Sequence, residues 1–411
     1  MANTFTHTQK VATAFLLLLK NRLKMGRLVN TDLADEYKGN AVAIGDTVKM
    51  RRTPEFSVRS NATFSDEAIQ VGSAQIKIDT QLGVDVKLTS KEEALDMDKL
   101  LKSKIMRAKA AALAQAIDEK LHDKILSFPQ WVGTPGELVN TPADFFVGMN
   151  RAADLAIPKE GLGAVLSPSD YYAMLGYFTS YNNGGDLSKN AISNGNIPML
   201  DGVPIAMTQN VVNLVTGSRE NATIAGNSQN VTYDAVKDTY TQTLDLASAG
   251  VSKTIKRGDV FTIAGVNAVN PVSKADLGYL QRFVVLENIT TESDETVTVK
   301  IGNPIISSGT YRTVSAAPVD GATVTWIGTA STAYRQNAIF HRDAIGLAFV
   351  KLPSPAGNSD VAFATDSETG ISIRYWRDSN ISTDEHLARC DVLFGTAMMD
   401  PRLGVRLSGT A

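Results

Sequence analysis

The chain has 411 residues, of which 43% are hydrophobic and 20% are charged, and its formal net charge is −3. This length exceeds what a single hydrophobic core usually supports, so we expect a soluble protein of two or three domains. A dedicated nucleic-acid-binding protein usually carries an excess of Lys and Arg, and this chain has no such excess. Any contact with nucleic acid is therefore expected to be weak and non-specific.

The single cysteine, Cys390, excludes an intramolecular disulfide and a cysteine-based zinc site, and it fits a reducing compartment such as the bacterial cytoplasm. The only long apolar run, residues 11–19, is too short to span a bilayer. Basic residues follow it where a signal peptide needs small ones, so we expect no membrane contact. The run instead predicts an amphipathic helix over residues 8–24 that docks on a partner or on the body of the protein.

A hairpin is predicted over residues 47–89, after a polar, charge-mixed arm that ends at residue 46. Its first strand, residues 47–58, contains Arg51 and Arg52. Its second strand alternates strictly between apolar and polar residues, which is typical of a β-strand. The apolar positions of that strand are Ile76, Ile78, Leu82, Val84, Val86 and Leu88. A two-stranded hairpin is marginally stable alone, so we expect it to lie on another surface.

A long helix is predicted over residues 91–128, from a capping box at Ser90 and Glu93 to the residue before Pro129. At ~1.5 Å per residue it would be roughly 55 Å long, which suggests a spine for the region of residues 90–140. Its apolar residues recur at helical spacing in two series. These are Leu101, Ile105, Ala108, Ala112 and Ala116, and Leu113, Ile117 and Leu121. We expect Ile117 and Leu121 to pack inside one subunit.

Residues 141–209 predict a small α/β region. The pattern indicates a helix over residues 144–156 and a short buried strand over residues 163–166. Another helix begins at Pro168, with Ser167 as its N-cap.

Residues 210–334 form an all-β segment rich in Val and Thr, which predicts a small barrel or sandwich inserted into the α/β chain. Its predicted strands are residues 230–236, 241–246, 260–264, 283–289, 296–301 and 323–327. We expect the flanking segments 204–206 and 338–340 to be strands that lie side by side. Strands resume in residues 335–411, at 343–352, 371–376, 390–394 and 402–407.

The sequence shows no recognisable catalytic or cofactor motif. A nucleophile elbow and a phosphate loop are absent, and the histidines show no metal-binding pattern. We place His122 on a charged face of the long helix, where Asp118 and Glu119 are interpreted as solvated. Arg257-Gly258-Asp259 is interpreted as a turn that has no further role. We therefore predict no enzyme, no cofactor and no metal site.

The order of these elements resembles the major capsid proteins of tailed bacteriophages, which have the Hong Kong 97 capsid fold. Two segments carry the resemblance: Ala164–Tyr172, with the sequence AVLSPSDYY, and Ala388–Gly395, with the sequence ARCDVLFG. The resemblance implies an α+β fold with an N-terminal arm, an E-loop hairpin, a P domain on a spine helix and an A domain. The corresponding ranges are 1–46, 47–89, 90–140 and 141–209, and residues 335–411 return to the A and P domains.

The all-β segment, residues 210–334, resembles the insertion domain of P22-type podoviral coat proteins. The resemblance rests on Lys256–Val266, with the sequence KRGDVFTIAGV, and on Asn337–Ile345, with the sequence NAIFHRDAI. It implies an icosahedral shell of many copies, assembled in the cytoplasm of a host bacterium and then part of the virion. It also implies a scaffolding protein and a portal protein as partners, and at most weak contact with packaged DNA.

Two other functions stay open at this point. An encapsulin-like, non-viral shell protein would share the fold, although the inserted β domain argues against it. An enzyme with an α/β core and a barrel domain would need a nucleophile, metal set or phosphate loop, which the sequence lacks. For a shell protein, the candidate contacts between subunits are Arg51, Arg52, Ile76, Ile78, Val84, Val86, Asp234, Lys237 and Asp238.

Overall fold

The computed structural model divides the chain into two compact units. The first comprises residues 1–49, 75–121 and 345–397, and the second comprises residues 50–74, 122–344 and 398–411. The structure describes residues 4–31, 47–52, 54–56, 70–89, 104–180, 195, 197, 199–355, 360–366, 369–380, 382 and 385–410.

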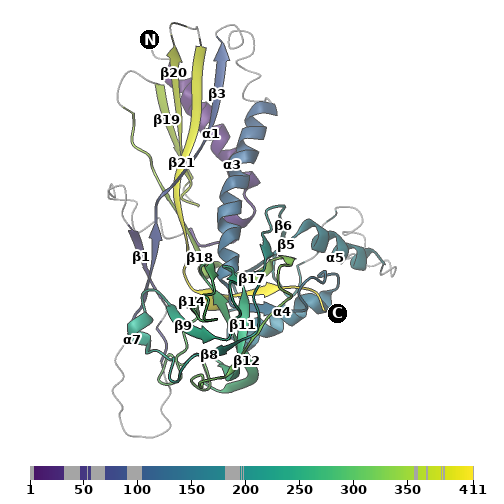
Figure 1. The fold of residues 1–411 in the computed structure, drawn as a ribbon. Coiled ribbons are helices and arrows are strands. Elements are labelled where there is room, and N and C mark those ends of the chain that lie inside the picture. The colour runs from purple at the N-terminus through teal and green to yellow at the C-terminus, as the bar shows by residue number, and fades with distance from the viewer. Residues whose placement is uncertain are drawn as a thin grey trace, which may run out of the picture. The chain divides into compact units, whose positions relative to one another are not determined.

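The first unit contains a five-stranded sheet in which β3, β21, β20 and β19 pair antiparallel (Figure 1). Its strands run in the order β18-β21-β20-β19, and β3 pairs with the other edge of β21. The strand bounds are Ile345–Val350 for β18, Asp360–Thr365 for β19, Ser372–Asn380 for β20, Glu385–Met398 for β21 and Thr80–Thr89 for β3. The predicted strands 371–376 and 390–394 are therefore confirmed as parts of longer strands, whereas β19 was missed.

The N-terminal helix α1, Thr4–Arg22, packs on β19 and β20 of this sheet (Figure 1). The α1 side chains Phe15 and Leu19 are fully buried. The Lys20 ammonium also forms an ion pair with Asp366 at 3.0 Å. The predicted amphipathic helix is confirmed with slightly earlier ends, and of its two predicted docking surfaces it uses the body of the protein.

The long helix is described from Lys104 to Asp123 as α3, and a 3-10 turn, Lys124–Ser127, extends it. The predicted capping box at residues 90–93 lies outside the described residues. Ile117 and Leu121 are fully buried, as predicted. The other apolar series does not form a buried face, because Ile105 is 51% exposed and Ala108 and Ala112 are exposed too.

The interpretation of Asp118 as a solvated residue was also wrong. Its side chain is buried and accepts hydrogen bonds from the backbone N–H groups of Lys24 (2.8 Å) and Gly26 (3.1 Å). These groups start the 3-10 turn Met25–Arg27, so Asp118 satisfies donors that would otherwise be buried unpaired. Burial raises the pKa of this carboxyl group, against the effect of the two N–H donors.

The predicted two-stranded hairpin is only partly correct. Strand β1, Thr47–Arg51, pairs with β2, Ser73–Lys77, as expected. The second half of the predicted strand is β3, which pairs with β21 over ten residue pairs, including Val84 with Cys390. The longer edge of β21 offers more backbone hydrogen bonds than the short first strand, so the alternating segment divides between two partners. The predicted turn at residues 59–67 lies outside the described residues.

The second unit contains a mixed five-stranded sheet in the order β4-β22-β17-β5-β6. The bounds are Gln130–Val132 for β4, Gly404–Leu407 for β22, Asn337–His341 for β17, Leu162–Leu166 for β5 and Ile205–Met207 for β6. Helix α4, Pro142–Asp154, precedes β5 in the sequence, and helix α5, Pro168–Ser180, follows it. Ser167 caps α5 as predicted, because its hydroxyl accepts from the Asp170 N–H at 3.2 Å.

The two segments expected to lie side by side at the insertion share this sheet but are not neighbours. Strand β5 lies between β6 and β17. The chain instead closes the base of the barrel with a separate antiparallel pair, β7 (Asn213–Val215) and β16 (Ala333–Arg335).

Six strands between these two close a barrel in the order β11-β12-β14-β9-β8-β15 (Figure 1). Their bounds are Ala222–Ile224 for β8, Thr241–Ala247 for β9, Val260–Val269 for β11, Asp276–Val285 for β12, Val297–Gly302 for β14 and Thr323–Trp326 for β15. The short strands β10, Thr254–Ile255, and β13, Ile289–Thr290, pair beside it. Val, Ile, Leu and Phe side chains fill its interior, and Leu244, Phe261 and Val299 are fully buried.

The predicted strand at residues 230–236 was wrong. This segment contains a helical turn, α7, from Tyr233 to Val236. Tyr233 and Val236 are three residues apart, so both point to the same side and pack with Tyr240, Ile306 and Tyr311.

His122 is a buried residue and does not lie on a charged face, as we had predicted. Its ring is fully buried, and Nδ1 accepts a hydrogen bond from the Val212 N–H at 3.2 Å. Burial lowers its pKa from 6.5 to about 4, so the ring is neutral at pH 7.

Candidate functional site: the barrel joint and the hairpin base

The turn Arg257–Asp259 lies where the chain enters β11 of the barrel. Gly258 has a φ of +94°, in the left-handed region that favours glycine. A Cβ atom at this position would approach Leu214 Cδ1 at 3.1 Å and Leu126 Cδ2 at 3.3 Å. The turn is therefore tightly packed on a cluster that also includes Trp131 and Tyr334.

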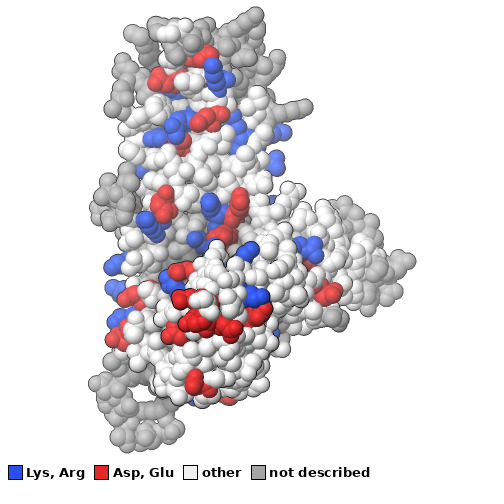
Figure 2. Space-filling model, viewed as in Figure 1, with Lys and Arg blue, Asp and Glu red and all other residues white. Residues whose placement is uncertain are grey.

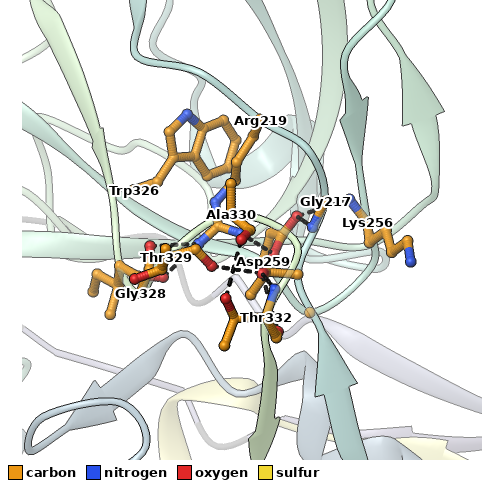
Figure 3. A network of polar contacts seen from close by, with 12 residues as sticks. Gly217, Arg219, Lys256, Asp259, Trp326, Gly328, Thr329, Ala330 and Thr332 are labelled. Atoms are coloured by element: carbon orange, nitrogen blue, oxygen red, sulfur yellow. Dashed lines mark hydrogen bonds and ion pairs between the residues drawn. The ribbon is translucent and has the colours of Figure 1, made fainter.

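Asp259 is the acceptor at the centre of this region. Its Oδ1 accepts from Arg219 Nη1 at 2.9 Å, and the two side chains are 0% and 1% exposed. Its Oδ2 accepts from the N–H groups of Lys256 (2.8 Å) and Gly217 (3.1 Å). Figure 3 shows the carboxylate enclosed by these groups. A buried charge with a partner for each oxygen is the arrangement that offsets the cost of desolvation.

Arg219 lies in the segment between β7 and β8, where the chain enters the barrel, and it bonds the segment between β15 and β16, where the chain leaves it. Its Nη2 donates to the carbonyl oxygens of Ile327 (2.6 Å) and Gly328 (3.1 Å). Its guanidinium group lies over the Trp326 ring, 5.4 Å from the centroid (Figure 3). Thr216 reinforces the closure, because its hydroxyl donates to Thr329 O at 2.7 Å.

The same turn is bonded to elements outside the barrel. Arg257 Nη1 contacts both carboxylate oxygens of Asp123 at 2.9 Å. Arg406 on β22 is fully buried and donates from Nη1 to Gly258 O at 2.9 Å. Burial lowers the pKa of Arg406 to about 9, and Asp259 opposes this shift. We call Arg219, Arg257, Gly258, Asp259 and Arg406 the barrel joint; our interpretation of the Arg-Gly-Asp turn as having no further role was wrong.

A second group of charges, most of them partly buried, lies at the hairpin base, which we define as residues 52, 54–55 and 70–73. Arg52 is 9% exposed and donates to Met399 O and Lys237 O, each at 3.2 Å. Glu55 forms ion pairs with Lys274 at 2.5 Å and with Arg402. Burial opposes the charged form of Arg402, but the carboxylates of Asp400 and Glu55 raise its pKa well above its usual value.

Four of the predicted contact residues meet here within one chain. Asp238 Oδ1 accepts from the Ser73 hydroxyl (2.7 Å) and N–H (3.1 Å). Lys237 pairs with Asp234 at 2.8 Å, three residues earlier, and its carbonyl oxygen binds Arg52. The structure therefore places Arg52, Asp234, Lys237 and Asp238 together within one chain, and their contacts to other subunits stay a prediction.

The remaining predicted contact residues differ in exposure. Ile76 and Ile78 are 0% and 7% exposed, so they pack inside their own chain and substituting them would destabilise the subunit. Val84 and Val86 on β3 are only half-buried, and Arg51 is exposed. These last three keep the exposure that a contact between subunits needs, as do Asp234 and Asp238 of the first group.

Sequence reasoning missed the buried arginines Arg219 and Arg406 and the partly buried Arg402. A weak signal exists in the segment Gly404–Leu407, because an arginine at the third position of a buried strand needs an internal partner. The identity of that partner depends on the tertiary fold.

The described part of the chain contains no cluster of three or more His, Cys, Asp or Glu side chains that could hold a metal ion. None of its described helices is long and apolar enough to cross a membrane. Figure 2 shows no extended basic patch on the visible face, and Asp and Glu gather in one group on its lower half.

A family model and a curated relative identify the family of this chain. The family model described as "P22 coat protein - gene protein 5" matches residues 1–409. A "Major capsid protein" of Acyrthosiphon pisum secondary endosymbiont phage 1 is 25% identical over 394 residues, 92% of this chain and 91% of that protein. A solved structure of Mycobacterium phage Che8 is similar at 12% identity and a TM-score of 0.44, over 93% of this chain and 90% of that one.

A further solved structure, the "CUS-3 coat protein I-domain", is 26% identical with a TM-score of 0.20, over 26% of this chain and 96% of that one. The argument rests on the family model, because it matches almost the whole length of the chain. The chain therefore belongs to the P22 coat protein family and is a phage capsid protein.

Proposed function

We propose that this chain assembles, in the cytoplasm of its bacterial host, into the icosahedral shell that encloses a phage genome. The observation that carries the proposal is the family match over residues 1–409. The ion pairs support it in part, since those of the barrel joint and the hairpin base hold protein segments together. The same family match disfavours the encapsulin-like alternative.

We further propose the Hong Kong 97 capsid fold for this chain, with the barrel as an insertion. In this assignment, residues 47–89 are the E-loop, residues 90–140 belong to the P domain with its spine helix, and residues 141–209 belong to the A domain. The insertion spans residues 210–334. The pair β7–β16 supports these limits, because Asn213 and Arg335 face each other where the chain enters and leaves the barrel.

Contacts between subunits are assigned to the exposed part of the hairpin and to β3. Val84 and Val86 support this assignment, because one chain leaves them half-buried. A scaffolding protein and a portal protein are further proposed partners. Contact with packaged DNA is weak and non-specific in this proposal, as the net charge of −3 supports.

Electron microscopy and sedimentation velocity of the purified chain, expressed with and without the scaffolding protein of its phage, test the proposal. We expect closed shells of uniform diameter in the co-expressed sample. A chain that stays monomeric and folded with the scaffolding protein present would contradict it.

A further inference from the structure

The two sides of the hairpin base are bound by loops of the barrel. On the first side, Glu55 pairs with Lys274, in the connection between β11 and β12. On the second side, Ser73 donates to Asp238, which follows α7 in the connection between β8 and β9. Two different barrel loops therefore contact the hairpin.

Tyr311, in the connection between β14 and β15, contacts both sides with one hydroxyl group. Its oxygen accepts from the Glu55 N–H at 3.3 Å and donates to the Gln70 carbonyl oxygen at 2.6 Å. The side chain is 8% exposed, so water competes little for these bonds. The distance between the two sides of the hairpin base is thus tied to the position of a single side chain.

The ring of Tyr311 is itself held in place. It is stacked on Tyr233 with a centroid distance of 3.6 Å and an interplanar angle of 1°. Both rings belong to the cluster that includes Val236 and Ile306. A Cβ atom at Gly72 would lie 2.3 Å from Lys237 O, so the second side of the hairpin passes too close to α7 for any other residue. These contacts leave the hairpin base little freedom relative to the barrel loops.

We propose that the barrel loops fix the spacing and orientation of residues 54–56 and 70–73 of the hairpin, with Tyr311 and Asp238 as positioning residues. The proposal rests on the proposed function, because it assumes that the hairpin contacts a neighbouring subunit. The barrel loops thereby control the geometry of the contacts that determine the curvature of the shell.

The test compares Tyr311→Phe with Tyr240→Phe. Tyr311→Phe removes the hydroxyl that bonds both sides and keeps the stacked ring. Tyr240→Phe removes a hydroxyl from the same cluster that contacts Asn303 at 3.5 Å instead of the hairpin backbone. Asp238→Ala and Asp234→Ala form a second matched pair, because Asp234 bonds Lys237 and Asp238 bonds Ser73.

Two measurements are made on each variant. Amide hydrogen exchange of the unassembled subunit should be about tenfold faster in residues 54–56 and 70–73 for Tyr311→Phe and Asp238→Ala, as expected for the loss of a hydrogen bond. Electron microscopy of co-expressed samples should show shells of broader diameter distribution for these two variants only. Wild-type exchange in both variants, or shells identical to those of the controls, would overturn the proposal.

Hydrogen exchange separates this inference from the proposed function. If the wild-type chain forms no shells, the proposed function fails and with it the effect on curvature. In that case the exchange of residues 54–56 and 70–73 still decides whether Tyr311 and Asp238 hold the hairpin.

Discussion

The barrel of the second unit and the sheet of the first unit are both antiparallel, but one chain completes only the barrel. Closure pairs both edges of every barrel strand, and Leu244, Phe261 and Val299 in its interior are fully buried. In the sheet, β3 pairs with β21 alone among the described strands, and its side chains Val84 and Val86 are half-buried. The difference supports the proposal that β3, and not the barrel, contacts another copy of the chain.

The largest expected effect is at the barrel joint. Arg219→Ala would leave the buried Asp259 carboxylate without its cation, at a cost of about 3–5 kcal/mol in the free energy of unfolding. Urea unfolding of the unassembled subunit measures this loss. Lys300→Ala is the control, because its pair with Glu287 is 41% and 56% exposed and should contribute at most about 1 kcal/mol. Equal losses in the two variants would mean that the joint is not a stabilising element.

The spine helix provides the corresponding test for the first unit. Ile117→Ala should cost ~2–5 kcal/mol and yield an insoluble subunit, because the side chain is fully buried. Ile105→Ala, on the same helix, should change the stability by no more than about 0.5 kcal/mol, because Ile105 is 51% exposed. Solubility and thermal unfolding measure both. A soluble, folded Ile117→Ala chain that fails only in assembly would mean that this face packs between subunits.

Acid should weaken the second unit through His122. Its pKa of about 4 in the folded state lies below the ordinary value of 6.5, so the neutral ring stabilises the fold fully above pH 6.5. That contribution is lost as the pH falls from 6.5 towards 4, and about 2 kcal/mol should be lost by pH 5.

His122→Asn tests this origin of the acid sensitivity, because the amide oxygen can still accept from the Val212 N–H and does not titrate. Urea unfolding at pH 7 and pH 5 should show a smaller stability difference for the variant than for the wild type. An unchanged difference would show that other groups cause the acid sensitivity.

The smallest effects give the most direct comparison of the two regions. Val299→Ala in the barrel should cost roughly 2 kcal/mol, and Val84→Ala on β3 should cost roughly 1 kcal/mol, because only the first is fully buried. Assembly should show the opposite order, with Val84→Ala raising the concentration needed for shells. If Val299→Ala impairs assembly more, the surface for other copies lies elsewhere.

Local patterns in the sequence determined several elements that do not depend on distant residues. Three features depend only on residues that are close in the sequence. They are the Ser167 cap of α5, the apolar face of α1 and the alternation of β3. The Val- and Thr-rich composition of residues 210–334 likewise indicated strands, because β-branched side chains suit a pleated surface. The short strands β7, β8 and β16 have too few residues for a periodicity to be visible.

Only the tertiary structure decided which buried charges meet. Asp118 and Lys24 lie 94 positions apart in sequence, and Arg406 and Gly258 lie 148 apart, so no local pattern could pair them. The strand pairing of residues 80–89 was decided in the same way, because alternation identifies a strand and its buried face but not its partner. The burial of a charge depends on which distant donors and acceptors the fold brings to it, and that is information no short segment of the chain contains.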